Sequence, residues 1–290
     1  MTAPASARAI PIRVVVTADD FGTSPAVNAA IVRAHREGVL TSASLMVTGA
    51  AFDEAVALAR ATPTLAVGLH LALADARPAL PARELPHLTD GDGRLPRNPA
   101  RAGLALAASG AARRELAREI AAQFERFAAT GLPLSHVDGH HHLHVHPAVF
   151  PAVAEHAARA GARAVRLPCE GLRALADASP RRAALDAAVL GVLGRTWRSL
   201  ARRRGLRFAA RVHGVVRSGA MDAAYLAALV ARLEPGVTEI FLHPSVEPAA
   251  PAAPRGPNAG DLAALVSPTV RAALAARGAA LTSWTATEAP

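Results

Sequence analysis

The chain has 290 residues, 51% of them hydrophobic, so it can bury one large core; a single α/β barrel of roughly 200–250 residues or more is a common use of that length. Its net charge of +9 comes from 32 basic and 23 acidic residues, and every basic residue is arginine. This lysine-free, alanine-rich composition is typical of a GC-rich coding bias, and aromatic residues make up only 3%, so we expect no nucleic-acid partner. The single cysteine, Cys169, excludes an internal disulfide framework and a multi-cysteine zinc site.

The chain shows no targeting or membrane-spanning signal. Residues 1–10 contain one arginine and no apolar run, so we expect a flexible N-terminus without a signal peptide. No segment reaches the ~18 uninterrupted apolar residues of a transmembrane helix. We therefore expect a cytoplasmic protein, in line with its single cysteine. The arginine-rich segment 181–207 predicts either a peripheral contact with the inner face of the membrane or a core helix with a solvated basic end.

Short apolar segments alternate with helices rich in alanine, leucine and arginine. Strands are predicted at 12–17, 43–47, 65–71, 134–138, 164–167, 208–213, 238–242 and 279–284. Helices are predicted at 24–37, 52–60, 111–129, 147–159, 181–203, 223–232 and 260–276, and the first has Ser24 as its N-cap and Pro25 at its first helical position. This alternation favours an α/β fold with mostly parallel strands, a (β/α) barrel-like, irregular TIM-type barrel.

Two segments, 75–101 and 244–261, are rich in proline and are predicted as long loops. They are not domain linkers, because the alternation of strands and helices resumes after each of them. We therefore expect a single domain over residues 1–290. Whether the 75–101 loop closes over a substrate stays open.

Ionisable side chains follow most of the predicted strands. The residues in question are Asp19, Asp20, His70, Arg166, His213 and His243, and the fourth strand leads into HVDGHHHLHVHP, which holds six of the twelve histidines. Because the carboxyl ends of barrel strands meet at one face, we expect these side chains to gather there. A purely structural protein would have little reason for this repetition.

Side chains of this kind suit hydrolysis assisted by one divalent metal ion. Asp20, His70 and one histidine from the 140s would supply three ligands from three strands. Asp19 should point away from Asp20, because successive strand residues alternate, and it is then available as a general base. His243 is a candidate general acid, and a histidine of the segment HVDGHHHLHVHP is the alternative. Each residue alone also has a structural interpretation, such as a helix cap, a core histidine or, for Arg166, an ion-pair partner.

The motifs ADDFG, GLHL, HVDGHHHLHVHP, RLP and FLHPS, in this order, resemble the YdjC-like carbohydrate deacetylase family over nearly the whole chain. The resemblance implies a barrel-like fold and the removal of acetyl groups from N-acetylated sugars. It further implies metal ligands Asp20, His70 and His140 and catalytic base Asp19, and His243 resembles the histidine of related polysaccharide deacetylases that assists the leaving amine. Apart from the resemblance, we expect His142, His144 and Arg166 to support the site or to contact the substrate.

Segments 24–56 and 67–81 resemble most the branch of this family that is associated with hopanoid biosynthesis. That branch implies a lipid-linked substrate, an N-acetylglucosaminyl hopanoid. The alternatives that remain open are a chito-oligosaccharide deacetylase acting on substrates such as diacetylchitobiose, another metal-dependent amidohydrolase or phosphoesterase, and a non-enzymatic metal-binding or lipid-associated protein. The metal, Zn²⁺ or Mg²⁺, and a homodimeric state are also left open.

Overall fold

The computed structural model describes residues 10–171, 181–251 and 253–286. Almost all of the N-terminus that the sequence predicted to be flexible lies outside these ranges. The strands are β1 (Ile12–Phe21), β2 (Ser42–Leu45), β3 (Ala66–Leu71), β4 (His136–Gly139), β5 (Ala164–Val165), β6 (Arg211–His213), β7 (Gly236–Leu242) and β8 (Ala280–Thr282).

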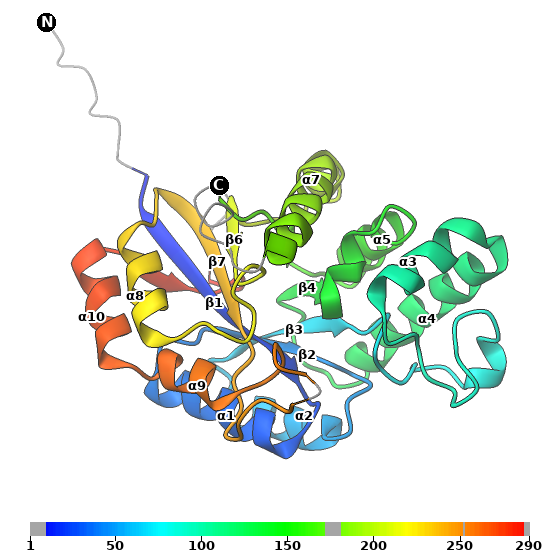
Figure 1. Ribbon diagram of the computed structural model, residues 1–290, viewed down its shortest axis with the longest axis horizontal. Helices are drawn as coiled ribbons and strands as arrows, with labels where there is room; N and C mark the ends of the chain where they lie inside the picture. The colour runs from blue at the N-terminus through cyan, green and yellow to red at the C-terminus, as the bar shows by residue number, and fades with distance from the viewer. Residues whose placement is uncertain (1–9, 172–180, 252, 287–290) are drawn as a thin grey trace, which may run out of the picture.

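Helices separate most of these strands (Figure 1). They are α1 (Pro25–Glu37), α2 (Phe52–Arg60), α3 (Pro99–Ala108), α4 (Gly110–Ala128), α5 (Phe150–Arg159), α7 (Arg181–Arg203), α8 (Ala223–Ala231), α9 (Ala259–Leu265) and α10 (Pro268–Arg277), with short 3₁₀ segments η1 (Ala82–Glu84) and η2 (His140–Val145).

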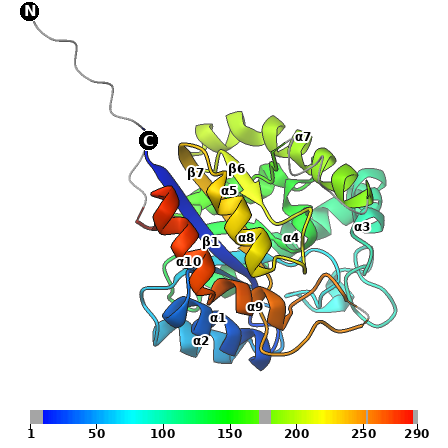
Figure 2. The same ribbon diagram turned by 60° about the vertical axis from the view of Figure 1, so that its left-hand side comes forward.

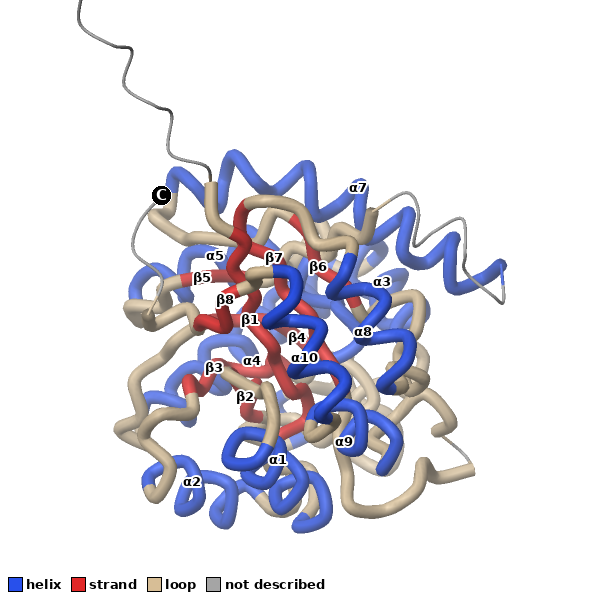
Figure 3. Tube along the Cα trace, turned by 90° about the vertical axis from the view of Figure 1, so that its left-hand side faces the viewer, coloured by secondary structure: helices blue, strands red, loops and turns tan. Residues whose placement is uncertain are grey.

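The strands form one parallel sheet in the order β5-β4-β3-β2-β1-β7-β6. Strand β1 is central to the sheet because it is long enough to pair with other strands along both of its edges. One edge pairs with β7, while the other pairs with β8 at Arg13–Val15 and with β2 from Thr17 to Phe21. Figure 3 shows the strands at the centre of the molecule with helices around them.

The two ends of the sheet, β5 and β6, approach each other without regular pairing. Residue Arg207, which lies between α7 and β6, forms a parallel bridge with Ala164 of β5. The Val212 N–H of β6 donates to the Cys169 carbonyl beyond β5, at 3.1 Å. The sheet is therefore a curled, irregularly closed α/β barrel, as the sequence predicted.

Most predicted elements are present, with three differences. The predicted helix 260–276 is two helices, α9 and α10, because Pro268 has no N–H to donate and instead occupies the first turn of α10. Helix α3 begins inside the segment that was predicted to be a loop up to residue 101. The helix predicted from Pro147 starts only at Phe150.

The outer helices pack in neighbouring pairs along the sheet (Figure 2). Helix α8 packs against α9 and α10, while α1 contacts α2, α9 and β1. Helix α1 starts as predicted, since the Ser24 hydroxyl accepts a hydrogen bond from the Val27 N–H and Pro25 occupies the first turn. These helices cover the apolar face of β1, where Val14, Val16 and Ala18 are buried.

The opposite face of the strands lines the barrel interior, and it is polar toward the carboxyl ends. Side chains from strands that are not neighbours in the sheet meet there: Ser44 of β2 bonds to Asp138 of β4, and Arg166, just after β5, bonds to Asp19 of β1. Gly68 of β3 is required at this face, because a Cβ there would lie 2.5 Å from the His136 ring.

Polar side chains on α4 hold the segment that follows β3. Gln123 exchanges two hydrogen bonds with the backbone of Ala72, at 2.9 and 2.8 Å. Glu119 accepts from the N–H groups of Ala79 and Leu80, and Glu115 accepts from that of His87. Residues 72–87 are thus fixed against α4 at three successive turns of the helix.

Candidate metal centre

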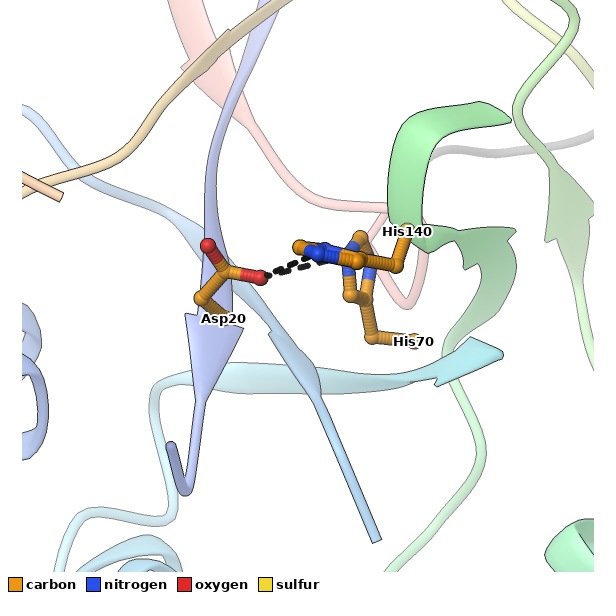
Figure 4. Close-up of side chains that lie close together, drawn as sticks. All are labelled: Asp20, His70 and His140. Carbon is orange, nitrogen blue, oxygen red and sulfur yellow. Dashed lines mark ion pairs between the residues drawn. The ribbon is translucent and has the colours of Figure 1, made fainter. Parts of the chain in front are cut away.

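Three side chains from different strands converge at the carboxyl face of the barrel (Figure 4). Asp20 comes from β1, His70 from β3 and His140 from the residue after β4. Their ligand atoms all lie within 4.8 Å of one another. The Asp20 Oδ1 atom is 3.1 Å from His140 Nδ1 and 3.5 Å from His70 Nε2. The structure therefore brings together the three residues that the sequence suggested as ligands.

The backbone turns sharply at Asp20. This residue has a φ of 66°, in the left-handed region, and the pairing of β1 with β2 shifts register between Ala18 and Phe21. The buried Asn28 of α1 holds the turn by accepting a hydrogen bond from the Gly22 N–H, at 2.8 Å. The prediction that the side chains of Asp19 and Asp20 point to opposite sides of the strand is therefore wrong. The carboxylates of both residues lie near His70.

Asp138 orients the His70 ring. The Nδ1–H of His70 donates to Asp138 Oδ1 at 2.8 Å, which leaves Nε2 facing Asp20. A carboxylate behind a ligating imidazole fixes its tautomer and strengthens it as a ligand. Burial opposes the charged form of His70, but Asp138, with Asp19 and Asp20, raises its pKa to about 9.

A second hydrogen-bond chain holds Asp138 from behind. The Ser44 hydroxyl donates to Asp138 Oδ2 at 2.7 Å and lies 3.0 Å from His136 Nε2. The other ring nitrogen of His136 lies 2.6 Å from the Ser135 hydroxyl. Burial lowers the pKa of His136 to about 4, so its ring is neutral and connects the Ser44 and Ser135 hydroxyls by hydrogen bonds.

Arg166 joins three buried carboxylates across the barrel interior. Its guanidinium bonds to both oxygens of Asp19, at 2.6 and 2.8 Å, and pairs with Asp138 at 2.8 Å and with Glu239 at 3.0 Å. The guanidinium carbon lies 4.5 Å over the Phe241 ring. Arg166 is 1% exposed, which favours the ion-pair role over substrate contact.

The charges in this region favour a bound divalent cation. Asp19, Asp20, Asp138 and Glu239 are all buried, and Arg166 is the one buried guanidinium that pairs with them among the described residues. Burial opposes the ionisation of Asp20, but the nearby His140, His243 and His70 hold its pKa well below the usual range. Its buried Oδ1 has no hydrogen-bond partner among the described residues. A buried, ionised oxygen that faces two imidazole nitrogens fits a metal site.

The histidine segment separates into residues with different surroundings. His136 and Asp138 complete β4, as predicted, and His140 follows at the start of η2. His141 and His142 then have φ values of 53° and 56°, two consecutive left-handed residues, which is costly for non-glycine residues. This turn lets His140 face Asp20 while His142 packs on Phe241, with ring centroids 5.1 Å apart.

His144 supports Arg166 and does not line an open rim. It is completely buried, and its Nε2 lies 2.8 Å from the Arg166 carbonyl oxygen. Burial lowers its pKa to about 4, so the neutral ring donates to that carbonyl. Burial also lowers the pKa of His142 well below its usual range. Both rings therefore act as neutral groups.

A second cluster of donor atoms lies further out and shares His140. It consists of Asp75, His140 and His141, but Asp75 and His141 are exposed and 3.8 Å apart. The cluster around Asp20 is far more buried. We therefore take Asp20, His70 and His140 as the candidate metal centre.

His243 lies at the edge of this centre. Its Nε2 is 4.0 Å from Asp19 Oδ2, beyond hydrogen-bond distance, and its side chain is 14% exposed. Asp261 of α9 accepts a hydrogen bond from the His243 N–H at 2.9 Å and so positions the end of β7. The structure thus places both proposed proton-transfer residues, Asp19 and His243, side by side.

Several supporting residues were not predicted from the sequence: Asn28, Ser44 and Glu239 carried no assigned role, and Asp138 was expected only to end a strand. One signal was available for Glu239. It lies two residues before Phe241 and four before His243, so the alternation along β7 puts it on the same face. Ser44 and Asn28 carry no such signal, because their partners are distant in sequence.

The fold and the site define a class of protein, the α/β barrels with an Asp-His-His cluster at the carboxyl face. The family profile described as YdjC-like protein matches residues 13–276. The chain therefore belongs to the YdjC-like family, and the resemblance seen in the sequence motifs is confirmed at this level.

Relatives with named activities match about half of the chain. A carbohydrate deacetylase of Brevibacillus brevis is 48% identical over 142 residues, which cover 49% of this chain and 54% of that protein. A carbohydrate deacetylase of Geobacillus stearothermophilus is 43% identical over 159 residues, covering 55% and 59%. A chitooligosaccharide deacetylase of an Enterobacter species is 39% identical over 160 residues, covering 51% and 56%. The matches thus span a little over half of each relative's length.

A solved structure agrees over the whole fold. A protein of Enterococcus faecalis V583, provisionally described as a cellobiose-phosphate cleavage protein, superposes with a TM-score of 0.74 over 96% of this chain and 100% of that chain, at 24% identity. At this identity the likeness supports the barrel fold alone. No helix among the described residues is both long and apolar enough to cross a membrane.

Replacing Arg166 should destabilise the fold strongly. We expect Arg166→Gln to lower the free energy of unfolding by about 3–5 kcal/mol, because it leaves buried carboxylates without their cation. The matched control is Arg33→Gln, which removes an exposed pair with Glu37 and should cost about 0.5 kcal/mol or less. Urea unfolding of both variants tests this, and equal losses would contradict the central role of Arg166.

Metal binding should depend on pH through His70. Its raised pKa of about 9 means that the metal-free site is protonated at neutral pH, and a metal ion must displace that proton. We expect the apparent Zn²⁺ affinity to rise about tenfold per pH unit from pH 7 and to level off near pH 9. Competition with a chelator measures this dependence. Asp138→Asn should move the plateau to lower pH, whereas a flat profile in the unmodified protein would rule out His70 as a ligand.

Proposed function

We propose that this protein is a metal-dependent hydrolase that removes the acetyl group from an N-acetylated amino sugar and releases acetate and the free amine. The observation that carries the proposal is the buried Asp20–His70–His140 cluster with Asp19 beside it. Membership of the YdjC-like family and relatives named carbohydrate deacetylase and chitooligosaccharide deacetylase support the reaction class.

The donor set suits a single catalytic ion. Two imidazole nitrogens and one carboxylate oxygen are a common set for catalytic Zn²⁺, whereas Mg²⁺ favours oxygen ligands, so Zn²⁺ is the first candidate. A divalent ion held there supplies a Lewis acid that polarises the acetyl carbonyl and stabilises negative charge on its oxygen.

Asp19 is the proposed general base. Arg166 binds one lone-pair position on each of its two oxygens and fixes the orientation of the carboxylate. Each carboxylate oxygen has a second position that can accept a proton from water. Asp19 would take this proton as the water oxygen forms a bond to the acetyl carbon.

His243 is the proposed general acid. It is partly exposed and lies 4.0 Å from Asp19, so it can face a substrate bound over the cluster. As the bond between the acetyl carbon and the sugar nitrogen breaks, His243 would donate a proton to that nitrogen. The products are acetate and a free amino sugar.

Removing a ligand should abolish metal binding and activity together. We expect Asp20→Ala and His140→Ala each to reduce bound Zn²⁺ to near zero and acetate release by at least about a thousandfold, because the Lewis acid is lost. Bound metal is measured by elemental analysis and acetate release with diacetylchitobiose as substrate.

The control is His141→Asn, which keeps a residue that tolerates the left-handed conformation but removes the ring from the outer cluster. We expect this variant to keep its metal and most of its activity. If it lost the metal while His140→Ala kept it, the ligand assignment would be wrong.

We further propose that the acceptor is lipid-linked, an N-acetylglucosaminyl hopanoid, as the resemblance to the hopanoid-associated branch implies. Large apolar side chains are exposed on two of the helices that pack against η2: Leu104 on α3, and Leu185, Val189 and Val192 along one face of α7. An exposed apolar patch of this kind suits an apolar partner. The same patch would allow a peripheral contact with a membrane that contains such a lipid.

The acceptor can be tested by comparing two substrates. We expect metal-loaded protein to release acetate from N-acetylglucosaminyl hopanoid with a higher kcat/KM than from diacetylchitobiose. The double variant Val189→Ser/Val192→Ser should raise KM for the hopanoid alone, by about tenfold, because that factor corresponds to the loss of about 1.4 kcal/mol of apolar contact from two partly buried side chains.

Leu281→Thr is the matched control, since Leu281 is an exposed apolar residue on β8, away from the carboxyl face. It should leave both KM values unchanged. Activity on diacetylchitobiose alone would reject the lipid-linked acceptor and leave the deacetylation proposal intact.

A further inference from the structure

A second site is suggested by a cavity at the opposite end of the barrel from the metal centre. It has a volume of about 1140 Å³ and lies at the amino-terminal ends of β1 and β7, near the start of β5 and the end of α7. Arg13, which lines it, is seven positions before Asp20 on β1, so the two sites are about 23 Å apart along the strand. The cavity is therefore separate from the proposed chemistry.

The described residues around the cavity carry positive charge and no carboxylate. Five arginines line it: Arg13, Arg163, Arg198, Arg202 and Arg207. Among the described residues, Glu234 pairs with Arg211 and Glu155 pairs with Arg204, both outside the cavity lining. Arginines gathered in this way repel one another, and burial together with the charge of Arg163 lowers the pKa of Arg207. An anion in the cavity would relieve this repulsion.

Several of these guanidinium groups are held in place by neutral partners. Arg198 donates to the Ala210 carbonyl at 3.0 Å, and its buried Nε has no hydrogen-bond partner among the described residues. The guanidinium carbons of Arg198 and Arg202 lie 5.7 and 5.3 Å from the centroid of the Phe208 ring. Arg207 donates to the carbonyl oxygen of Trp284. The donors are thus oriented before any ligand arrives.

The rest of the wall is apolar. Ile10, Leu206, Phe208, Val237 and Trp284 line the cavity, and Ile10 is 68% exposed. The volume is slightly above the roughly 300–1,000 Å³ typical of small-molecule sites and far exceeds the needs of an inorganic ion. Guanidinium groups bind phosphate oxygens in bidentate fashion, and aromatic walls bind apolar groups.

From these features we infer that the cavity binds an organic phosphate. The phosphate group contacts Arg163, Arg198 and Arg202, and the apolar portion packs against Phe208 and Trp284. A soluble phosphate ester and the headgroup of an anionic phospholipid share this chemistry. The inference does not depend on the proposed deacetylation.

Calorimetry on the full chain tests the inference with two soluble probes, phenyl phosphate and inorganic phosphate. We expect phenyl phosphate to bind at least about tenfold more tightly, because its ring adds apolar contact worth about 1.4 kcal/mol or more. Co-sedimentation with phosphatidylglycerol vesicles, compared with phosphatidylcholine vesicles, tests the lipid source. Binding to phenyl phosphate identifies a soluble ester as a sufficient ligand, while binding only to phosphatidylglycerol identifies a lipid headgroup.

The double variant Arg163→Gln/Arg202→Gln should weaken binding of the effective probe by about tenfold or more. The matched control, Arg159→Gln/Arg203→Gln, removes the same charge from exposed arginines outside the cavity, on α5 and α7, and should change affinity less than about twofold. Both variants should keep the circular-dichroism spectrum and the Tm of the unmodified protein, which shows that they fold. The inference is overturned if no probe binds, or if the control loses as much affinity as the cavity variant.

Discussion

The guanidinium of Arg166 is the interaction on which the rest of the active face depends. It projects from the end of β5 to carboxylates on β1, β4 and β7, so one side chain connects strands across the barrel interior. A buried ion cluster of this kind adds little net stability compared with an apolar core, but breaking it is costly. Its value here is positional, because it fixes Asp19 directly and His70 through Asp138.

The candidate metal centre and its supports form two layers with different tasks. The outer layer, Asp20, His70 and His140, presents atoms to the open face, while the inner layer of neutral histidines, hydroxyls and carboxylates holds those atoms in place. The buried carboxylates outnumber Arg166, and protonated His70 adds a second positive charge beside them. A cation bound at the candidate centre would stabilise the folded chain, because folding brings the three donor residues together.

Much of the fold could be predicted from local sequence patterns. The eight strands follow from short apolar segments, and Ser24 with Pro25 marks the start of α1 correctly. The ligands Asp20 and His70 could be selected because each ends a strand. The left-handed turn at His141 and His142 could not be predicted, because histidine does not signal such a turn and tertiary contacts impose it.

The supporting residues show the same limit. Glu239 lies on the same face as His243, so the alternation of side chains along the strand could have identified it. The Ser44–Asp138 hydrogen bond could not be predicted in this way, because it joins residues 94 positions apart. Long-range pairs of this kind depend on the curvature of the sheet, which local patterns do not specify.

The attachment of residues 72–87 to α4 has an evolutionary consequence. This segment beside the candidate metal centre is held on a helix by hydrogen bonds to Glu115, Glu119 and Gln123, and these bonds do not involve Asp20, His70 or His140. Insertions or exchanges beyond the attachment points can therefore reshape the space for an acceptor while the reacting groups stay where they are. A family built in this way can diversify its substrates by drift in one segment and keep a single chemistry.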